Sequence, residues 1–310
     1  MFRTATCLAA LAALTAPAAL AETKSYDAEA FSSIDARGAI DVVYEHAAKP
    51  SIIVEQAEGD FSDVYLEFDG DTLIVSRNSV RDRSGWFGNT SISIKDNRKV
   101  IKVNGKRVPY YIVRVAGPDL DGARAASSAK LVANGIQSDD FAAKASSSGD
   151  LELSGTAVNA NLKASSSGDL KASAFTVESL EIHASSSGDV EAVSSSTGRV
   201  LIEASSSGEV ELRSLGAADF MVDASSSADV ELEGACGTIE VEASSSADVD
   251  AAKLTCRAAT VAASSSGDVS VHATESIEAQ ASSGGDVYVT GNPASRDISK
   301  SSGGDVDFAS

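Results

Sequence analysis

Acidic residues recur at a nearly constant interval through the second part of the chain. Most follow the motif A-S-S-S-G/A and precede Val or Leu, at intervals of 18 to 20 residues. The nine acids are Asp150, Asp169, Asp189, Glu209, Asp229, Asp248, Asp268, Asp286 and Asp305. Carboxylates in such a series can bind Ca²⁺, pair with a cationic surface, or hydrogen-bond the hydroxyls of a glycan. A structural alternative is that each accepts backbone N–H bonds at a bend and fixes the turn.

The overall charge restricts the partners that these acids can have. The formal net charge is -20, of which residues 119–310 carry -19 and residues 22–118 only -2. A nucleic-acid surface needs clustered cations, so nucleic acid is excluded as a partner. A dedicated Ca²⁺ cage needs six to eight oxygens, more than one carboxylate per repeat supplies. We therefore expect no cofactor, and binding of Ca²⁺ is the less favoured alternative.

One basic segment, between residues 77 and 107, interrupts this acidic composition. Its candidate binding residues combine cations with two aromatic side chains: Arg81, Arg83, Trp86, Phe87, Arg98, Lys99, Lys106 and Arg107. A protruding hairpin of this kind could contact an anionic glycan or a lipid headgroup. The alternative is a solvated hairpin whose aromatic side chains cover the open end of the fold.

The period of the acidic motif predicts how the chain is folded. Together with a degenerate first copy, in which Lys130 holds the acid position, about ten repeats of 19–20 residues tile residues 119–310. A period near 20 without a helical pattern is typical of an all-β solenoid, in which each repeat forms one coil. Equivalent residues of successive coils should then lie about 4.8 Å apart.

Alternation within the repeat predicts which side chains face inward. Around Asp169, Ala160, Leu162 and Ala164 share one parity, so the small and apolar groups should form the core. The same parity places one serine of each motif inside: Ser147, Ser166, Ser186, Ser206, Ser226, Ser245 and Ser265. Ala228 and Ala247 replace the glycine of the motif, which argues against a left-handed backbone at that position.

Two cysteines, Cys236 and Cys256, lie one period apart. In a solenoid their Cα atoms should be about 4.8 Å apart, within the range that a disulfide can bridge. We expect a disulfide, because an exported protein meets an oxidising compartment. A pair of buried thiols is the alternative.

The first 21 residues have the features of a secretory signal peptide. Arg3 provides the positive region, Leu8 to Leu14 the apolar region, and Ala19-Leu20-Ala21 a cleavage site before Glu22. The apolar run is too short to span a bilayer. We expect a soluble, exported protein without a transmembrane segment, in the periplasm or at the cell surface.

Residues 22–118 differ from the repeats by their large aliphatic and aromatic side chains, and they predict a β-rich N-terminal cap continuous with the solenoid. A family resemblance is carried by four segments of this part and by the S-S-x-G-D coils that follow them. The segments are Phe31-Ser32-Ser33-Ile34, Gly38 to Val42, Leu73-Ile74-Val75 and Gly117 to Leu120. The chain resembles the putative auto-transporter adhesin, head GIN domain family over nearly all of its mature length. The resemblance implies a right-handed parallel β-helix, a surface or periplasmic location and no established catalytic residues.

The composition favours binding over catalysis. Polysaccharide lyases and hydrolases need paired acids or a basic proton abstractor in an aromatic-lined groove, and the repeats offer a single acidic doublet, Asp139-Asp140, with few aromatic residues. We expect a non-enzymatic interaction or structural module of the cell envelope, with an envelope glycan or protein as partner. A polysaccharide-active β-helix enzyme is the alternative.

Overall fold

The computed structural model describes residues 22–56, 59–78, 90–95, 98–103 and 105–309, whose elements are strands. The expected signal peptide lies outside these residues. Within them, no helix has the length and apolar character needed to cross a membrane. The N-terminal strands are β1 (Glu22–Tyr26), β2 (Ser33–Arg37), β3 (Asp41–His46), β4 (Ser51–Gln56), β5 (Val64–Asp69), β6 (Thr72–Arg77), β7 (Thr90–Lys95), β8 (Arg98–Val103), β9 (Lys106–Val108) and β10 (Tyr111–Gly117).

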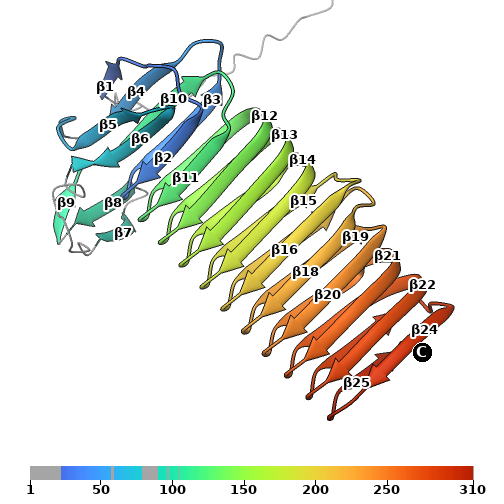
Figure 1. Ribbon diagram of the computed structural model, residues 1–310. Helices are drawn as coiled ribbons and strands as arrows, with labels where there is room; N and C mark the ends of the chain where they lie inside the picture. The colour runs from blue at the N-terminus through green and yellow to red at the C-terminus, as the bar shows by residue number, and fades with distance from the viewer. Residues whose placement is uncertain (1–21, 57–58, 79–89, 96–97, 104, 310) are drawn as a thin grey trace, which may run out of the picture.

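From β11 onward the chain winds into a parallel β-solenoid (Figure 1). Its strands are β11 (Gly122–Ala126), β12 (Lys130–Ser146), β13 (Asp150–Ser165), β14 (Asp169–Ser185), β15 (Asp189–Ser194), β16 (Arg199–Ser205), β17 (Glu209–Ser214), β18 (Asp219–Ser225), β19 (Asp229–Ala235), β20 (Thr238–Ser244), β21 (Asp248–Ser264), β22 (Asp268–Ser282), β23 (Asp286–Thr290), β24 (Ser295–Lys300) and β25 (Asp305–Phe308). Each coil pairs in parallel with the next, so that Asp150 lies beside Asp169. The predicted all-β solenoid with a period near 20 is confirmed.

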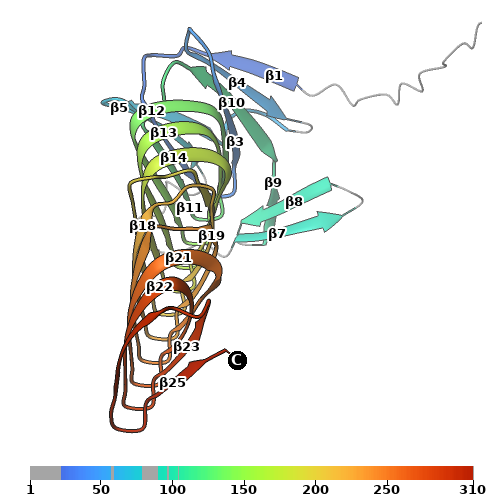
Figure 2. The same cartoon turned by 90° about the vertical axis from the view of Figure 1, so that its right-hand side faces the viewer.

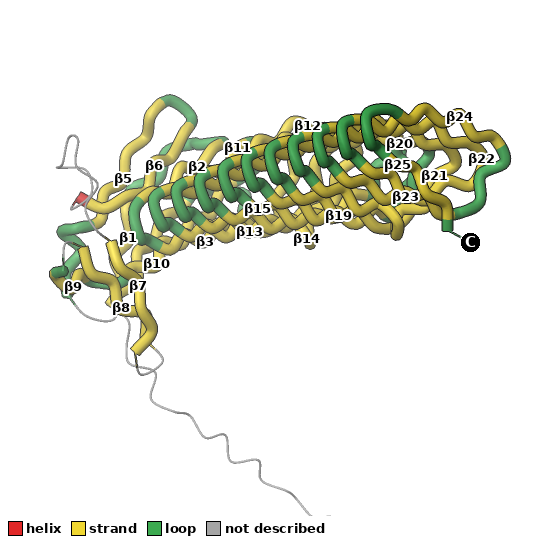
Figure 3. The backbone as a smooth tube through the Cα atoms, turned by 90° about the horizontal axis from the view of Figure 1, so that it is seen from below, coloured by secondary structure: helices red, strands yellow, loops and turns green. Residues whose placement is uncertain are grey.

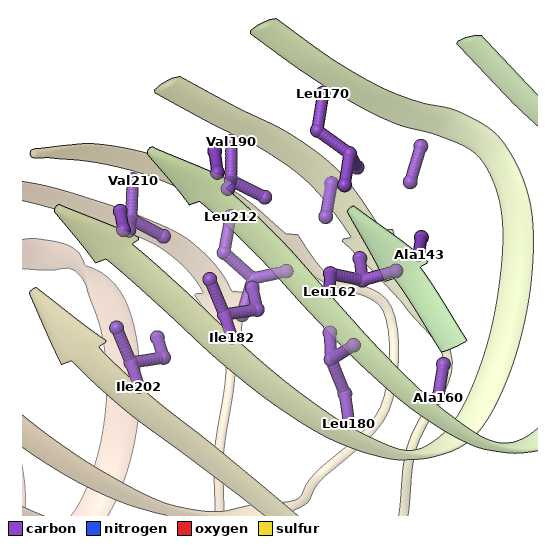
Figure 4. Packing of buried hydrophobic residues seen from close by; sticks show 14 of the residues in the cluster. Ala143, Ala160, Leu162, Leu170, Leu180, Ile182, Val190, Ile202, Val210 and Leu212 are labelled. Carbon is purple, nitrogen blue, oxygen red and sulfur yellow. The ribbon is translucent and has the colours of Figure 1, made fainter. Parts of the chain in front are cut away.

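Small and branched apolar side chains fill the interior between the two walls of each coil. On one wall Leu162 pairs with Ile182 and Ile182 with Ile202 in the next coil, and all three are fully buried. Figure 4 shows these side chains opposite Leu170 and Val190 of the other wall. A parallel sheet buries its backbone polar groups in ladders, so a thin core of such residues suffices to hold the coils together.

Each coil reverses direction at a tight corner, which two serines form in most coils and Ser-Gly forms in the last two. Ser166 and Ser167 have φ angles of 54° and 58°, and the Gly168 N–H donates to Ser165 O at 3.1 Å. Positive φ at both central residues, with a hydrogen bond from the fourth residue to the first, is the pattern of a type I′ turn. Figure 3 shows these corners, drawn in green, in a single file along one edge of the solenoid.

The corner corrects the predicted facing of the serines. Seven serines expected inside are exposed instead: Ser147, Ser166, Ser186, Ser206, Ser226, Ser245 and Ser265. Strand alternation does not continue through a type I′ turn, because both tip residues point outward. The corners hold together through the backbone, since Ser167 N–H donates to Ser186 O at 3.3 Å and its equivalents repeat this bond along the file.

The glycine that follows the two serines is buried and does not have a positive φ, as predicted. A Cβ built on Gly168 would lie 2.5 Å from the backbone of Ala145 in the preceding coil. Ala129, Ala228 and Ala247 nevertheless occupy the same position in other coils and are fully buried. The neighbouring backbone therefore gives way to a methyl group in those coils.

The first coil of the solenoid comes from the N-terminal part of the chain. Strands β2 and β3 pair in parallel with β11 and β12, and between them Gly38 and Ala39 have φ angles of 80° and 47°. The Ala39 N–H donates to Ser127 O at 3.2 Å, the bond that serine corners make with one another. Gly38-Ala39-Ile40-Asp41 thus replaces Ser-Ser-Gly-Asp in a coil that the serine motif does not reveal.

The remaining N-terminal strands close this end of the solenoid. β10 and β4 extend the sheet beyond β3, while β6 and β5 extend the other sheet beyond β2. Arg77 at the end of β6 is fully buried and donates to Asp63, to Ala39 O at 3.2 Å and to Pro109 O at 2.7 Å. One guanidinium therefore joins the closing strands to the first corner.

A disulfide joins Cys236 to Cys256, whose Cα atoms are 4.7 Å apart. The predicted pairing and spacing are confirmed. Cys236 lies between β19 and β20, at the bend opposite the serine corner, and both cysteines are buried. The bond therefore fixes two successive coils at the side where strand alternation is interrupted.

Candidate functional site

The nine predicted acids form one column on the outer surface of the solenoid. Strand register places each beside the next, from Asp150 to Asp305, and all nine are exposed. The column continues toward the N-terminus through Lys130 and Asp41. We call it the acidic column; it lies on the strand that follows each corner, because the acid is the first residue after the turn.

A second column of acids, which the sequence reasoning did not identify, runs beside the first. Its members lie two residues further along each strand, on the same side of the sheet: Glu152, Glu191, Glu211, Glu231 and Asp250, with Lys171 between the first two. The alternation of strand residues could have revealed it. We call the outer surface of these strands, with both columns, the acidic face.

Four successive coils of the acidic face carry two carboxylates each and few cations. From Asp189 to Asp250, the residues of the two columns are acids in every coil. The nearest cations, Lys171, Arg213 and Lys253, lie at the border of this group of acids. Lys171 Nζ lies 3.2 Å from Glu191 Oε2, and Arg213 Nε lies 3.4 Å from Glu233 Oε1. A shallow groove of about 420 Å³ follows this part of the face.

The pKa values of three carboxyls on this face are raised. Partial burial is the main cause for Asp189, Glu209 and Asp248, and neighbouring acids of the column add to it. A raised carboxyl pKa means that the charged form is disfavoured in the folded protein. A cation placed against the face would relieve this repulsion, which is the property that a cation-binding surface needs.

The geometry does not provide a chelating site among the described residues. No group of three His, Cys, Asp or Glu side chains there is arranged to hold a metal ion. The corners are closed by backbone bonds such as Gly149 N–H to Ser146 O at 3.1 Å. The carboxylate of Asp286 accepts the Asp305 N–H at 3.1 Å, a bond between coils. The face is thus an extended array of carboxylates rather than a cage.

The strands that precede each corner carry a different outer surface, which we call the mixed face. One of its columns changes sign along the solenoid, in the order Asp35, Arg124, Lys144, Lys163, His183, Glu203, Asp223 and Glu242. His183 lies 2.8 Å from Glu203 and 2.6 Å from Glu181 through its two ring nitrogens. Carboxylates only accept hydrogen bonds, so His183 can donate to both acids at once only when each ring nitrogen carries a proton.

The predicted basic patch is only partly within the described residues. Arg81, Arg83, Trp86 and Phe87 lie outside them, and Arg98 and Lys99 belong to β8. Lys106 and Arg107 are exposed on β9.

Strands β7, β8 and β9 form a separate antiparallel sheet that projects from the first coil (Figure 2). Buried Ile101 of β8 contacts Ala39 at the first corner, with Val108 and Tyr110 packed against the pair. The hairpin that the sequence suggested is therefore present and rests on the corner. Arg77, the first cation of the segment, belongs to the buried structure and not to this surface.

Comparisons with known proteins identify one matching family. The sequence matches the family described as "Putative auto-transporter adhesin, head GIN domain" over residues 30–211 and 192–293. No curated protein matches it. Among solved structures, a protein from Parabacteroides distasonis, titled a putative lipid binding protein, is 17% identical, with 94% of this chain and 97% of that chain covered and a TM-score of 0.44. A putative adhesin from Parabacteroides merdae is 15% identical, with coverage of 94% and 96% and a TM-score of 0.43.

Proposed function

Because the chain belongs to the putative auto-transporter adhesin, head GIN domain family, we propose that it is an exported, non-enzymatic interaction module of the cell envelope whose acidic face binds a cationic partner. The observation that carries this proposal is the pairing of carboxylates across four successive coils, from Asp189 to Asp250, with cations only at the border. A partner with several cations would meet many carboxylates at a spacing of about 4.8 Å. Such a surface gives affinity through repetition, as in other multivalent interactions.

Binding of a hexalysine peptide at about 0.15 M salt tests this function. Replacing three acids of the face together, Glu209→Gln, Glu211→Gln and Glu231→Gln, should weaken binding about tenfold, because three partly exposed charge pairs are lost. The matched control changes three exposed acids of the mixed face, Glu240→Gln, Glu242→Gln and Glu278→Gln. Both variants change the net charge equally, so equal weakening would show that only net charge acts and would contradict the proposal.

Two further measurements on the same samples separate the alternatives. Tight, saturable binding of one Ca²⁺ that prevents hexalysine binding would replace the cationic partner by the ion. Release of reducing ends from polygalacturonate would replace the interaction module by a polysaccharide-active enzyme. We expect neither result.

A further inference from the structure

A second groove lies on the mixed face, where β13, β14 and β16 run side by side (Figure 1). Its volume is about 370 Å³, which is at the lower end of the range for small-molecule sites. Its rim carries amide, hydroxyl, carboxylate and guanidinium groups together with one outward leucine: Asp140, Asn159, Asn161, Ser179, Glu181, Arg199 and Leu201. Of these residues, only Asp140 belongs to a pattern visible in the sequence, the acidic doublet Asp139-Asp140.

The acids near this groove are already hydrogen-bonded within the protein. Glu181 Oε1 lies 2.6 Å from His183 Nε2, and Glu181 Oε2 accepts a hydrogen bond from Asn161 Nδ2 at 2.7 Å. Asp140 accepts from Asn159 Nδ2 at 2.8 Å. Asp219 lies beside Arg199 in the strand register, yet its carboxylate accepts two bonds from Thr238. These carboxylates keep their negative charge, and their remaining lone pairs can accept hydrogen bonds from the hydroxyls of a ligand.

The cations around the groove make no such hydrogen bond, although the charge of Lys163 helps to lower the pKa of Glu181. Within the described part of the chain, Arg199, Lys163 and Lys144 make no ion pair and no side-chain hydrogen bond, and all three are exposed. Arg199 stands at one border of the groove, and Lys163 follows Asn161 at the other. On a chain of net charge -20, this is a place where exposed cations with free hydrogen-bond donors lie beside acids that can accept from hydroxyls.

We propose that this groove binds a short acidic glycan, a chain of sugar units that carry carboxylates. Arg199 and Lys163 are four residues apart along the strand direction, which is roughly 13 Å, and two coils apart across the sheet, which is roughly 10 Å. A trisaccharide of uronic acids can place carboxylates toward both cations, and the planar guanidinium of Arg199 can bind one of them in a bidentate manner. Asn159 and Ser179 offer donors and acceptors to the sugar hydroxyls, while Leu201 offers an apolar contact to a sugar ring.

Titration with trigalacturonic acid, followed by amide NMR shifts and calorimetry, tests the proposal. The shifts should map to β13, β14 and β16, and maltotriose, a neutral trisaccharide with the same type of linkage, should bind at least tenfold more weakly. Arg199→Gln and Lys163→Gln should each weaken trigalacturonic acid binding about tenfold, as expected for a charge-assisted hydrogen bond. The matched control is Lys253→Gln, an exposed cation on the acidic face, which should leave binding unchanged.

Three results would overturn the proposal: absence of binding up to about 10 mM probe, equal binding of maltotriose, or equal weakening by Lys253→Gln. Because all three replaced cations are exposed, the variants should retain the thermal unfolding midpoint of the native protein. Hexalysine binding to the acidic face should be the same in Arg199→Gln as in the native protein. Failure of the glycan site is thereby distinguishable from failure of the proposed function.

Discussion

The acidic face and the mixed face belong to the same coils and have the same spacing, yet their charges differ: acids pair with acids through four coils of the acidic face, whereas a column of the mixed face changes from cations to acids at His183. On the acidic face Glu209 stands beside Asp189 and Asp229, whereas on the mixed face His183 stands between Glu203 and Glu181. The parallel ladder fixes the backbone distance between neighbours at about 4.8 Å, so side chains in a column can separate only by rotation about their own bonds. Two like charges at this distance repel by roughly 0.9 kcal/mol in water.

The mixed face demonstrates that this fold can place opposite charges next to each other. The repulsion on the acidic face is therefore a property of the residues chosen there and not a consequence of the solenoid. A surface that holds uncompensated charge at a fixed spacing gains free energy when a partner supplies the opposite charge. The difference between the faces is thus the reason to look for a cationic partner on one and an acidic ligand on the other.

The largest expected effect comes from the disulfide at the bend where the acidic face passes into the mixed face. Replacing Cys236 and Cys256 together by Ala should lower the free energy of unfolding by about 3 kcal/mol, because the bond closes a loop of 20 residues. Urea unfolding followed by circular dichroism measures the change. The native protein under reducing conditions is the control, and a loss below about 1 kcal/mol would contradict a stabilising role of this link.

The second effect concerns the opposite junction of the two faces, the serine corner. Ser206→Val should cost about 2 kcal/mol, because a β-branched residue is strongly disfavoured at a φ of 53°. Ser205→Val, one residue earlier in β16, should change stability by less than about 0.5 kcal/mol, because valine suits an extended strand. Ser206→Gly should stay close to the native protein. Equal losses from the two valine variants would rule out positive φ as the cause.

The sequence allowed the solenoid, the acidic column and the disulfide to be predicted, since all three follow from a fixed period. The corner could not be predicted, because Ser166 and Ser167 are not the usual residues for positive φ and only their position in the turn requires it. The first coil was missed because Gly38-Ala39-Ile40-Asp41 has the geometry of the corner without its serines. The groove beside Arg199 was missed because its residues come from separate coils and share no motif.

The third effect is a gain in stability on the acidic face. Glu209→Gln should raise the free energy of unfolding at pH 7 by roughly 0.5 kcal/mol, because it removes a charge repelled by its neighbours. The pKa of Glu209 is raised by partial burial and by Asp189, Glu211 and other acids. A raised carboxyl pKa lowers stability above that pKa, and the penalty vanishes as pH falls below the ordinary value. The gain should therefore be present at pH 7 and absent below about pH 4.

The smallest effect comes from a Glu→Gln substitution on the mixed face, where the expected change in the free energy of unfolding has the opposite sign. Glu181→Gln should lower the free energy of unfolding at pH 7 by about 0.3 kcal/mol, because the partly exposed hydrogen bond between the Glu181 carboxylate and His183 is weakened. The hydrogen bond from His183 lowers the pKa of Glu181, so its contribution is present above the ordinary pKa and disappears as pH falls through the lowered value. Thermal unfolding of both glutamine variants across pH gives the comparison directly. If both substitutions shift stability in the same direction, total charge decides the result, and the two faces do not differ in the way that their columns imply.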